Sequence, residues 1–212
     1  NVKISTLPGA GALTNNGIVL NANDSVTVAD INAGKLKFTP VADANKAGYA
    51  SFTFQVQDNG GVANGGIDLD PSANTITIDV TSVNDAPSGA DKTVTTLEDT
   101  AYTFTAADFG FTDPIDAANS SGANALANVK ISTLPIAGAL TNNGIALNAN
   151  DSVTVADINA GKLKFTPVAD ANKAGYASFT FQVQDNGGVA NGGIDLDPSA
   201  NTITIDVTSV ND

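Results

Sequence analysis

Five residue types are absent from the 212-residue chain: Cys, His, Met, Trp and Arg. Without Cys and His, the chain has no thiol nucleophile, no Ser-His-Asp triad and none of the usual zinc or transition-metal ligand sets. Any catalysis would rest on carboxylates, Lys and Tyr, because the most versatile acid–base residue is missing. We therefore expect a protein that is not an enzyme, and one with no disulfide bonds to hold its loops.

The charge of the chain is strongly of one sign. Nine Lys residues stand against 21 Asp and a single Glu, Glu98, and the formal net charge is −13. Such a surface cannot neutralise a row of phosphates, so nucleic acid is excluded as a partner. No apolar run reaches the roughly 18 residues of a membrane-spanning helix, so no membrane insertion is expected. The preference for Asp is informative, because Asp favours turns and binds hard cations through oxygen.

The sequence contains a long internal repeat. Residues 1–85 recur as residues 128–212, and only two of these 85 positions differ: Gly9 becomes Ile136 and Val19 becomes Ala146. Residues 86–127 occur once. The offset of 127 residues is far longer than the repeat of a helical solenoid, so each unit should be a domain in a tandem array. We predict a complete repeat over 86–212, preceded by a partial repeat over 1–85 that lacks the first two strands.

Within the complete repeat, apolar residues alternate with polar ones at a period of two. The clearest examples are SFTFQVQD at 178–185 and NTITIDVTSV at 201–210. Further strands are predicted over 92–97, 101–105, 128–132, 144–147, 152–155 and 162–165, with one helical turn over 156–161. Gly- and Asn-rich turns separate these segments. Seven or eight strands without a long helix predict an all-β fold, a two-sheet β-sandwich of Greek-key type.

Most Asp residues fall between the expected strands. In such a sandwich, the loops that carry Asp113, Asp116 and Asp185 meet at one end, and the turn with Glu98 and Asp99 lies at the other. Within each acidic cluster the carboxylates would repel one another unless a cation lay between them. Ca²⁺ accepts six to eight oxygen ligands and suits such clusters. The alternative is that each Asp or Asn only forms its turn, and we expect Asp108 and Asp157 to be cap or turn residues.

Several strings resemble a known family. SFTFQVQDNGG, followed by NTITIDVTSVNDAP as in 74–87, resembles the end of a cadherin-like, Ig-like repeat, while LEDT and FTDPIDA resemble its acidic loops. Nearly identical, Asp-rich tandem units of this kind form the extender regions of giant bacterial RTX-type surface adhesins. The resemblance implies a Ca²⁺ cofactor, and Asp195 and Asp197 in the insertion NGGIDLDP at 191–198 are candidates for an additional site. The implied and candidate ligands are Asp58, Asn84, Asp85, Glu98, Asp99, Asp113, Asp116, Asp185, Asp195, Asp197, Asn211 and Asp212.

The resemblance implies a calcium-rigidified stalk domain of a secreted adhesin on the bacterial cell surface, acting in attachment or biofilm formation. Its expected partners are adjacent repeats of the same chain, with strand exchange with a second molecule as a further expectation. The alternative function is a repeat that itself binds carbohydrate or a neighbouring cell through calcium. An enzyme using Asp113 and Asp116 as acid and base is the third hypothesis, and the one least supported by the residues.

Overall fold

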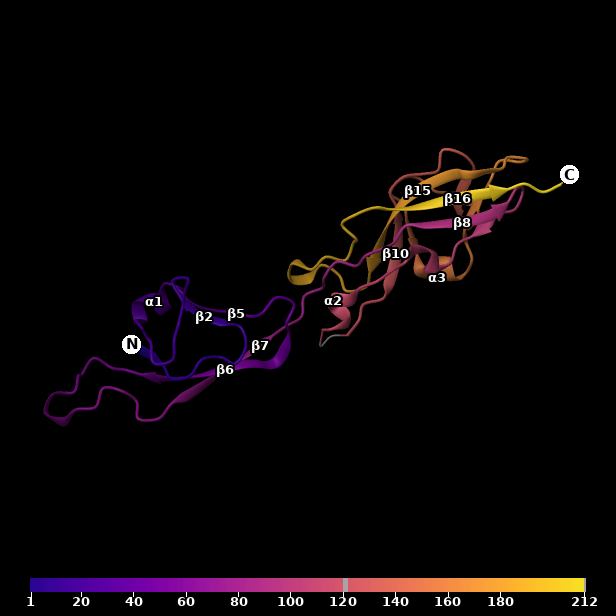
Figure 1. The fold of residues 1–212 in the computed structure, drawn as a ribbon. Coiled ribbons are helices and arrows are strands. Elements are labelled where there is room, and N and C mark those ends of the chain that lie inside the picture. Colours follow the sequence, from indigo (N-terminus) through magenta and orange to yellow (C-terminus); the bar gives the residue numbers. More distant parts are fainter. Residues whose placement is uncertain (120–121, 212) are drawn as a thin grey trace. The chain divides into compact units, whose positions relative to one another are not determined.

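In the computed structural model, which describes residues 1–119 and 122–211, short strands form several mostly antiparallel sheets with a few short helices between them (Figure 1). The all-β class predicted from the period-two pattern is confirmed. The chain divides into two units, Asn1–Ser82 and Val83–Asp212. No helix in the described part of the chain is long and apolar enough to cross a membrane.

The second unit is built from two sheets, with strand orders β13-β10-β15-β16-β8 and β12-β11-β14-β9. Its strands are β8 (Lys92–Leu97), β9 (Tyr102–Thr103), β10 (Leu126–Ile131), β11 (Ala139–Asn142), β12 (Ile145–Ala146), β13 (Ser152–Thr154), β14 (Leu163–Thr166), β15 (Lys173–Asp185) and β16 (Asn201–Thr208). Its helical turns are η2 (Ala106–Phe109), α2 (Pro114–Ala117), α3 (Val155–Asn159) and η3 (Ala190–Gly192). The predicted helical turn is α3, which Thr154 caps by accepting a hydrogen bond from the Asp157 N–H.

Both sheets of the second unit contribute to one hydrophobic core. Phe179 and Phe181 of β15 and Phe165 of β14 are at most 1% exposed. Phe104 packs edge-on against Phe179, and Phe109 packs edge-on against Phe181, at ring-centroid distances of 5.5 and 5.0 Å. Residues 104–109 are therefore part of the core that the alternating strands build.

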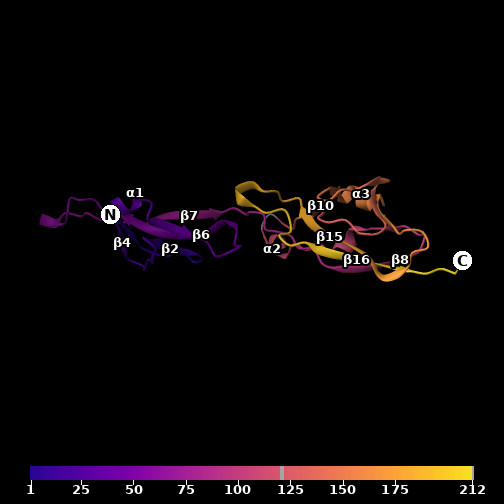
Figure 2. The same cartoon turned by 90° about the horizontal axis from the view of Figure 1, so that it is seen from above.

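The first strand of the second unit runs parallel to the last one. Lys92 lies opposite Ile203 and Leu97 opposite Thr208, and Figures 1 and 2 show β8 beside β16. The other strand pairs of this unit are antiparallel. Because β8 and β16 end together, Glu98 lies at the end of the unit where β16 finishes, while the chain before β8 lies at the opposite end.

The first unit has the sheets β4-β1-β6-β7 and β3-β2-β5. Its elements are β1 (Val2–Ile4), β2 (Ala12–Asn15), β3 (Ile18–Val19), β4 (Ser25–Val26), α1 (Val28–Asn32), β5 (Leu36–Thr39), β6 (Lys46–Val56), η1 (Ala63–Gly65) and β7 (Asn74–Val80). Each strand matches one of the second unit, but each sheet is one strand shorter. In the described part of the chain, no strand takes the positions beside β7 and β5 that β8 and β9 take beside β16 and β14.

Two local features differ from the sequence predictions. The strand predicted over 101–105 covers only Tyr102–Thr103, because Thr105 and Asp108 form a capping box that starts η2. Alternation along β7 and β16 suggests that Asp79 and Asp206 are only solvated strand residues. Each also accepts a backbone hydrogen bond: Asp206 from the Gly175 N–H at 2.6 Å, next to the register shift in β15, and Asp79 from the Gly48 N–H.

Candidate metal site

Asp113 and Asp116 are positioned by the four-residue helix α2, labelled in Figure 1. Asp113 is the N-cap, and its Oδ1 accepts a hydrogen bond from the Asp116 N–H at 3.4 Å. Pro114 follows at the first helical position, where an N–H would have no partner within the helix. Both carboxylates are buried, with 7% of Asp113 and 1% of Asp116 exposed. The local sequence therefore folds two acidic groups into the interior of one end of the unit.

Asp185 ends β15 at the same end of the unit, and Asn84 connects to it. The Asn84 amide donates to Asp185 Oδ1 at 3.1 Å and to the Ile194 carbonyl at 2.8 Å. Asn124 donates from Nδ2 to Asn84 Oδ1 and to Asp116 Oδ2, the latter at 2.9 Å. The Asp85 N–H donates to the same Asp116 oxygen at 2.8 Å. We call Asn84, Asp85, Asp113, Asp116, Asn124 and Asp185 the α2-end cluster.

The electrostatics of the α2-end cluster are those of carboxylates without a counter-ion. Burial raises the pKa of Asp113, and the nearby Asp116 charge adds to the increase. Burial also raises the pKa of Asp185, helped by the charges of Asp113 and Asp195. The ion pairs among the described residues are Lys35–Asp30, Lys92–Asp108 and Lys162–Asp157, so none of them reaches this cluster.

One atom of the cluster is buried without any partner. Asp113 Oδ2 makes no hydrogen bond to the described residues, although its side chain is more than nine-tenths buried. An unsatisfied buried polar atom is costly and is rare in folded proteins. A cation, a water molecule or a proton on the carboxyl group can satisfy such an oxygen.

Glu98 and its neighbours form a second group at the other end of the unit. Glu98 is 5% exposed and accepts hydrogen bonds from the Val210 N–H at 2.6 Å and from Asn172 Nδ2 at 2.7 Å. Asp99 accepts from the Asp170 N–H at 3.2 Å. The turn with Glu98 and Asp99 therefore contacts the loop with Asp170 and Asn172 at this end of the unit. Asn211 is exposed, and Asp212 lies outside the described residues.

The carboxylates of the 186–200 connection have different surroundings. Asp197 is 2% exposed and accepts from the Gly89 N–H, the Ser199 N–H and hydroxyl, and the Asn201 amide at 2.8–3.1 Å. Its oxygens are therefore used in tying the chain before β8 to the turn before β16. Asp195 accepts from Gln184 at 3.0 Å. These two residues are not joined to Asp113 or Asp116 by a hydrogen bond that the described residues show.

Asp58 occupies the place in the first unit that Asp185 occupies in the second. The two lie in identical sequence, yet Asp58 is exposed while Asp185 is 3% exposed. Asp58 accepts the N–H of Gly60 at 2.7 Å, just as Asp185 accepts that of Gly187 at 2.8 Å. What distinguishes them is the α2 loop and residue 84, which bury only Asp185.

Sequence reasoning missed Asn124, which joins Asn84 to Asp116, and Asn119, which donates to Asp116 Oδ1 at 2.8 Å. The contact of Asn124 with Asn84 spans 40 residues and leaves no local signal, whereas Asn119 lies only three residues after its acceptor. The helix α2 itself did have a signal, because Asp-Pro followed by Asp two residues later is typical of a capped helix start.

No group of three or more acidic side chains among the described residues already forms a metal centre. The α2-end cluster could therefore bind a metal only with amide or backbone oxygens added and its carboxylates drawn together.

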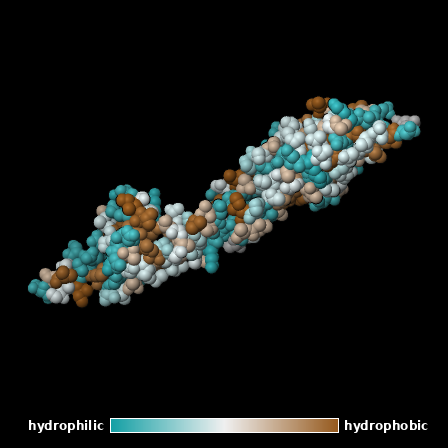
Figure 3. All heavy atoms as spheres, in the orientation of Figure 1, coloured by the Kyte–Doolittle hydropathy of each residue, from teal (hydrophilic) through white to brown (hydrophobic). Residues whose placement is uncertain are grey.

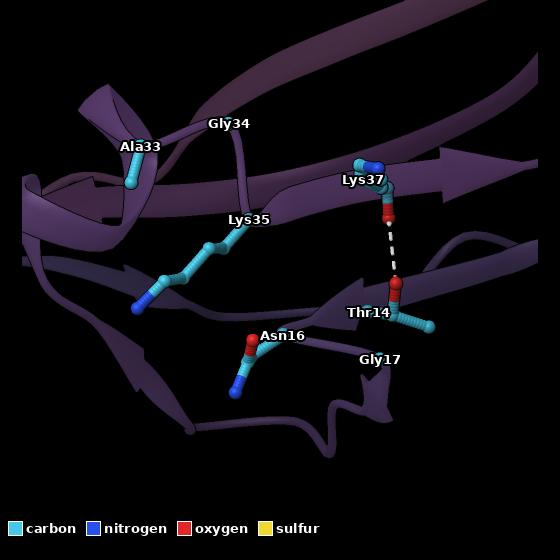
Figure 4. A pocket seen from close by; sticks show the side chains of 7 residues that line it. All are labelled: Thr14, Asn16, Gly17, Ala33, Gly34, Lys35 and Lys37. Carbon is cyan, nitrogen blue, oxygen red and sulfur yellow. Dashed lines mark hydrogen bonds between the residues drawn. The ribbon is translucent and has the colours of Figure 1, made fainter.

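A separate pocket in the first unit is lined by Thr14, Asn16, Gly17, Ala33, Gly34, Lys35 and Lys37 (Figure 4). This lining contains no carboxylate, and Lys35 is paired with Asp30 at 2.8 Å.

Comparison with known proteins gives one short match. A family model described as a G5-linked ubiquitin-like domain matches residues 135–156, which include β11, β12 and β13. The match covers about a tenth of the chain and includes both positions, Ile136 and Ala146, at which the two copies differ. Ile136 is 99% exposed, and nothing in the structure explains its replacement of Gly9. No curated protein matches the chain.

Proposed function

We propose that the chain is a calcium-binding extender segment of a secreted bacterial surface adhesin. The observation that carries this proposal is the unpartnered, buried Asp113 Oδ2, which lies in a cluster with Asp116 and Asp185 that no Lys of the described residues reaches. A protein with 22 acidic residues and nine Lys gains stability from a divalent cation at such a place.

The chemistry of the donors fits Ca²⁺. Asp113, Asp116 and Asp185 supply carboxylates, and Asn84 and Asn124, which bind these carboxylates through their amides, could turn their side-chain oxygens to a metal. Asp85, whose N–H contacts Asp116, adds a further carboxylate to this part of the chain. All are oxygen ligands, as Ca²⁺ prefers, and the chain has none of the nitrogen or sulfur ligands that favour zinc. Calcium held here would fix residues 84–85, which lie at the start of the second unit, to the α2 and β15 ends of that unit. That fixation is the stiffening step of the proposed stalk.

The finer fold belongs to the same proposal. The parallel pairing of β8 with β16 and the two sheets around one core support a Greek-key, cadherin-like sandwich, repeated every 127 residues. Among the described residues, the large apolar side chains that are exposed are all aliphatic, which also agrees with a role as a stalk. Carbohydrate-binding surfaces usually present aromatic rings, so no observation favours the binding-module alternative.

The test is thermal unfolding of the full chain, monitored by circular dichroism, in the presence of chelator, of Mg²⁺ or of Ca²⁺. We expect Ca²⁺ at about 100 times its dissociation constant to stabilise the second unit by roughly 2.7 kcal/mol. Mg²⁺ should give far less, because it demands a tight octahedron and loses water reluctantly. An Asp113→Asn variant should lose most of the increment while staying folded. Equal melting temperatures in chelator and in Ca²⁺ would overturn the proposal.

A further inference from the structure

The same sequence is buried in one unit and open in the other. Ile203 of β16 and Val183 of β15 are fully buried, whereas their counterparts Ile76 and Val56 are 41% and 50% exposed. Phe181 is fully buried, but its counterpart Phe54 is only half-buried. Figure 3 shows hydrophobic atoms on the surface of the first unit. We call the face formed by Phe54, Val56, Ile76, Ile78 and Val80 the open face.

Two strand edges accompany the open face. In the second unit, β16 pairs with β8 and β14 pairs with β9, but β7 and β5 are outermost in their sheets. The Thr202 N–H, on the outer edge of β16, donates to Asp91 Oδ1 at 2.7 Å. The equivalent edge position in β7 is Thr75. An unpaired edge next to an apolar surface is a template for pairing with another strand.

An acidic hollow continues the open face. It is lined by Val56, Asp58, Ile67, Asp68, Leu69, Asp70 and Pro71, with a volume of about 440 Å³. In the second unit, the equivalent carboxylate of Asp197 uses Oδ2 to accept the Gly89 N–H at 2.8 Å as well as the Asn201 amide. Asp70 Oδ2 accepts only from Asn74 among the described residues. Asp70 in this hollow can therefore accept the hydrogen bond that the Gly89 N–H donates to Asp197 in the second unit.

We propose that the open face is a docking site for a segment with the sequence of residues 86–112. The second unit shows how such a segment binds, because residues 86–112 pack there against a nearly identical acceptor sequence. There it provides six residue pairs to β16, two to β14, and the rings of Phe104 and Phe109 to the core. The acceptor differs between the copies at only two of 85 positions, both outside the open face. This proposal does not depend on calcium.

The acceptor surface selects this segment over an arbitrary strand. Phe104 and Phe109 need the rings of residues 52 and 54 as partners, and Gly89 must approach closely, because a Cβ there would lie 2.7 Å from the Asn201 amide in the second unit. A strand of β-forming residues alone would pair with the backbone groups at the edge of β7, but it would leave the positions of Phe104 and Phe109 empty.

The experiment uses the full chain and a ¹³C,¹⁵N-labelled synthetic peptide of residues 86–112, read by hydrogen exchange and mass spectrometry. Peptides within 20–84 and 147–211 are identical in sequence, so each digested fragment reports both copies at once. Without peptide, fragments covering 74–80 and 201–207 should show two isotope envelopes, one fast and one slow. Peptide at about 100 times its dissociation constant should slow the fast envelope by on the order of 100-fold, so that the two converge.

Three controls decide the interpretation. A peptide with F104D and F109D should leave the fast envelope unchanged. The chain variant Ile76→Lys should abolish the convergence, and Thr75→Pro, which removes an edge N–H, should do the same if the first variant fails to fold. Exchange within unlabelled residues 92–109 should stay slow, because displacement of the chain's own segment would place the peptide on the wrong unit.

Two envelopes that persist with peptide would overturn the proposal. So would a dimer of open faces, seen by sedimentation, that the peptide does not dissociate.

Discussion

At the residue scale, the chemistry of a carboxylate in this chain depends on what covers it. Asp58 and Asp185 have identical flanking sequences and both accept an N–H two residues ahead. Only Asp185 is buried, beside Asn84, and this burial raises the pKa of Asp185. A turn-forming role therefore explains Asp58 completely, but for Asp185 it leaves a buried charge without a Lys partner among the described residues.

A matched pair of variants follows from this contrast. Asp185→Asn should remove most of the calcium-dependent stabilisation, because it removes one proposed carboxylate ligand. In chelator it should leave the second unit as stable as the parent or more so, since the buried charge is gone. Asp58→Asn, the same change in the same sequence, should preserve the calcium increment. Differential scanning calorimetry with and without chelator measures both, and equal behaviour of the two variants would contradict the assignment.

The pKa directions predict how stability depends on pH without calcium. Asp113 and Asp185 have pKa values raised above their unfolded values, so their favourable contribution is present below about pH 4 and is lost as pH rises through the raised values. Asp108 has a lowered pKa despite its burial, through hydrogen bonds from Lys92 and Thr105, and it acts in the opposite direction below about pH 4.

In chelator, therefore, the melting temperature of the second unit should fall as pH increases from about 4 to 7, and saturating Ca²⁺ should flatten or reverse this slope. Melts at four or five pH values, in both buffers, provide the measurement. The variant with both Asp113→Asn and Asp185→Asn serves as the control and should show little slope in chelator. A melting temperature that rises with pH in chelator would show that other carboxylates dominate.

At the scale of elements, the strands were predictable and their irregularities were not. Alternation placed β8 at its observed bounds and identified β15 and β16, because each buries one face and exposes the other. The bulge in β15 was missed, since Gly175 with φ +60° and its acceptor Asp206 lie 31 residues apart. The buried surroundings of Asp116 were missed for the same reason, because the Asp85 N–H that binds its carboxylate lies 31 residues away in the chain.

The bulge gives a prediction of its own. Asp206→Ala removes the acceptor of the Gly175 N–H, so the second unit should lose roughly 0.5–1.5 kcal/mol, the usual net contribution of one hydrogen bond. Asp206→Asn keeps an acceptor oxygen and should recover most of the loss. Urea unfolding curves quantify both changes. A loss of less than a few tenths of a kcal/mol in the Ala variant would mean that Asp206 is the solvated strand residue that its alternation suggested.

At the scale of the whole molecule, two nearly identical sequences have unequal cores. Five Phe residues, Phe104, Phe109, Phe165, Phe179 and Phe181, are at most 1% exposed in the second unit, while the largest fully buried side chain of the first is Ile4. The difference comes from residues 86–127, which pack with 128–212 to form the second unit. Sequence repetition could predict this inequality because the segment occurs once. It could not predict that the remaining 82 residues still form paired sheets.

The full chain should therefore unfold in two steps, of which calcium moves only one. Loss of apolar burial lowers stability in proportion to the exposed area, so the first unit should melt at the lower temperature. Every residue of the α2-end cluster belongs to the second unit, so Ca²⁺ should raise the upper transition and leave the lower one in place. Calorimetry of the parent chain, of Ile76→Lys and of Asp113→Asn separates the steps, because the first variant acts on the lower transition and the second on the calcium shift of the upper one. A single transition that calcium moves as a whole would contradict the division into units of unequal stability, because it would require the open unit to share the stability of the complete one.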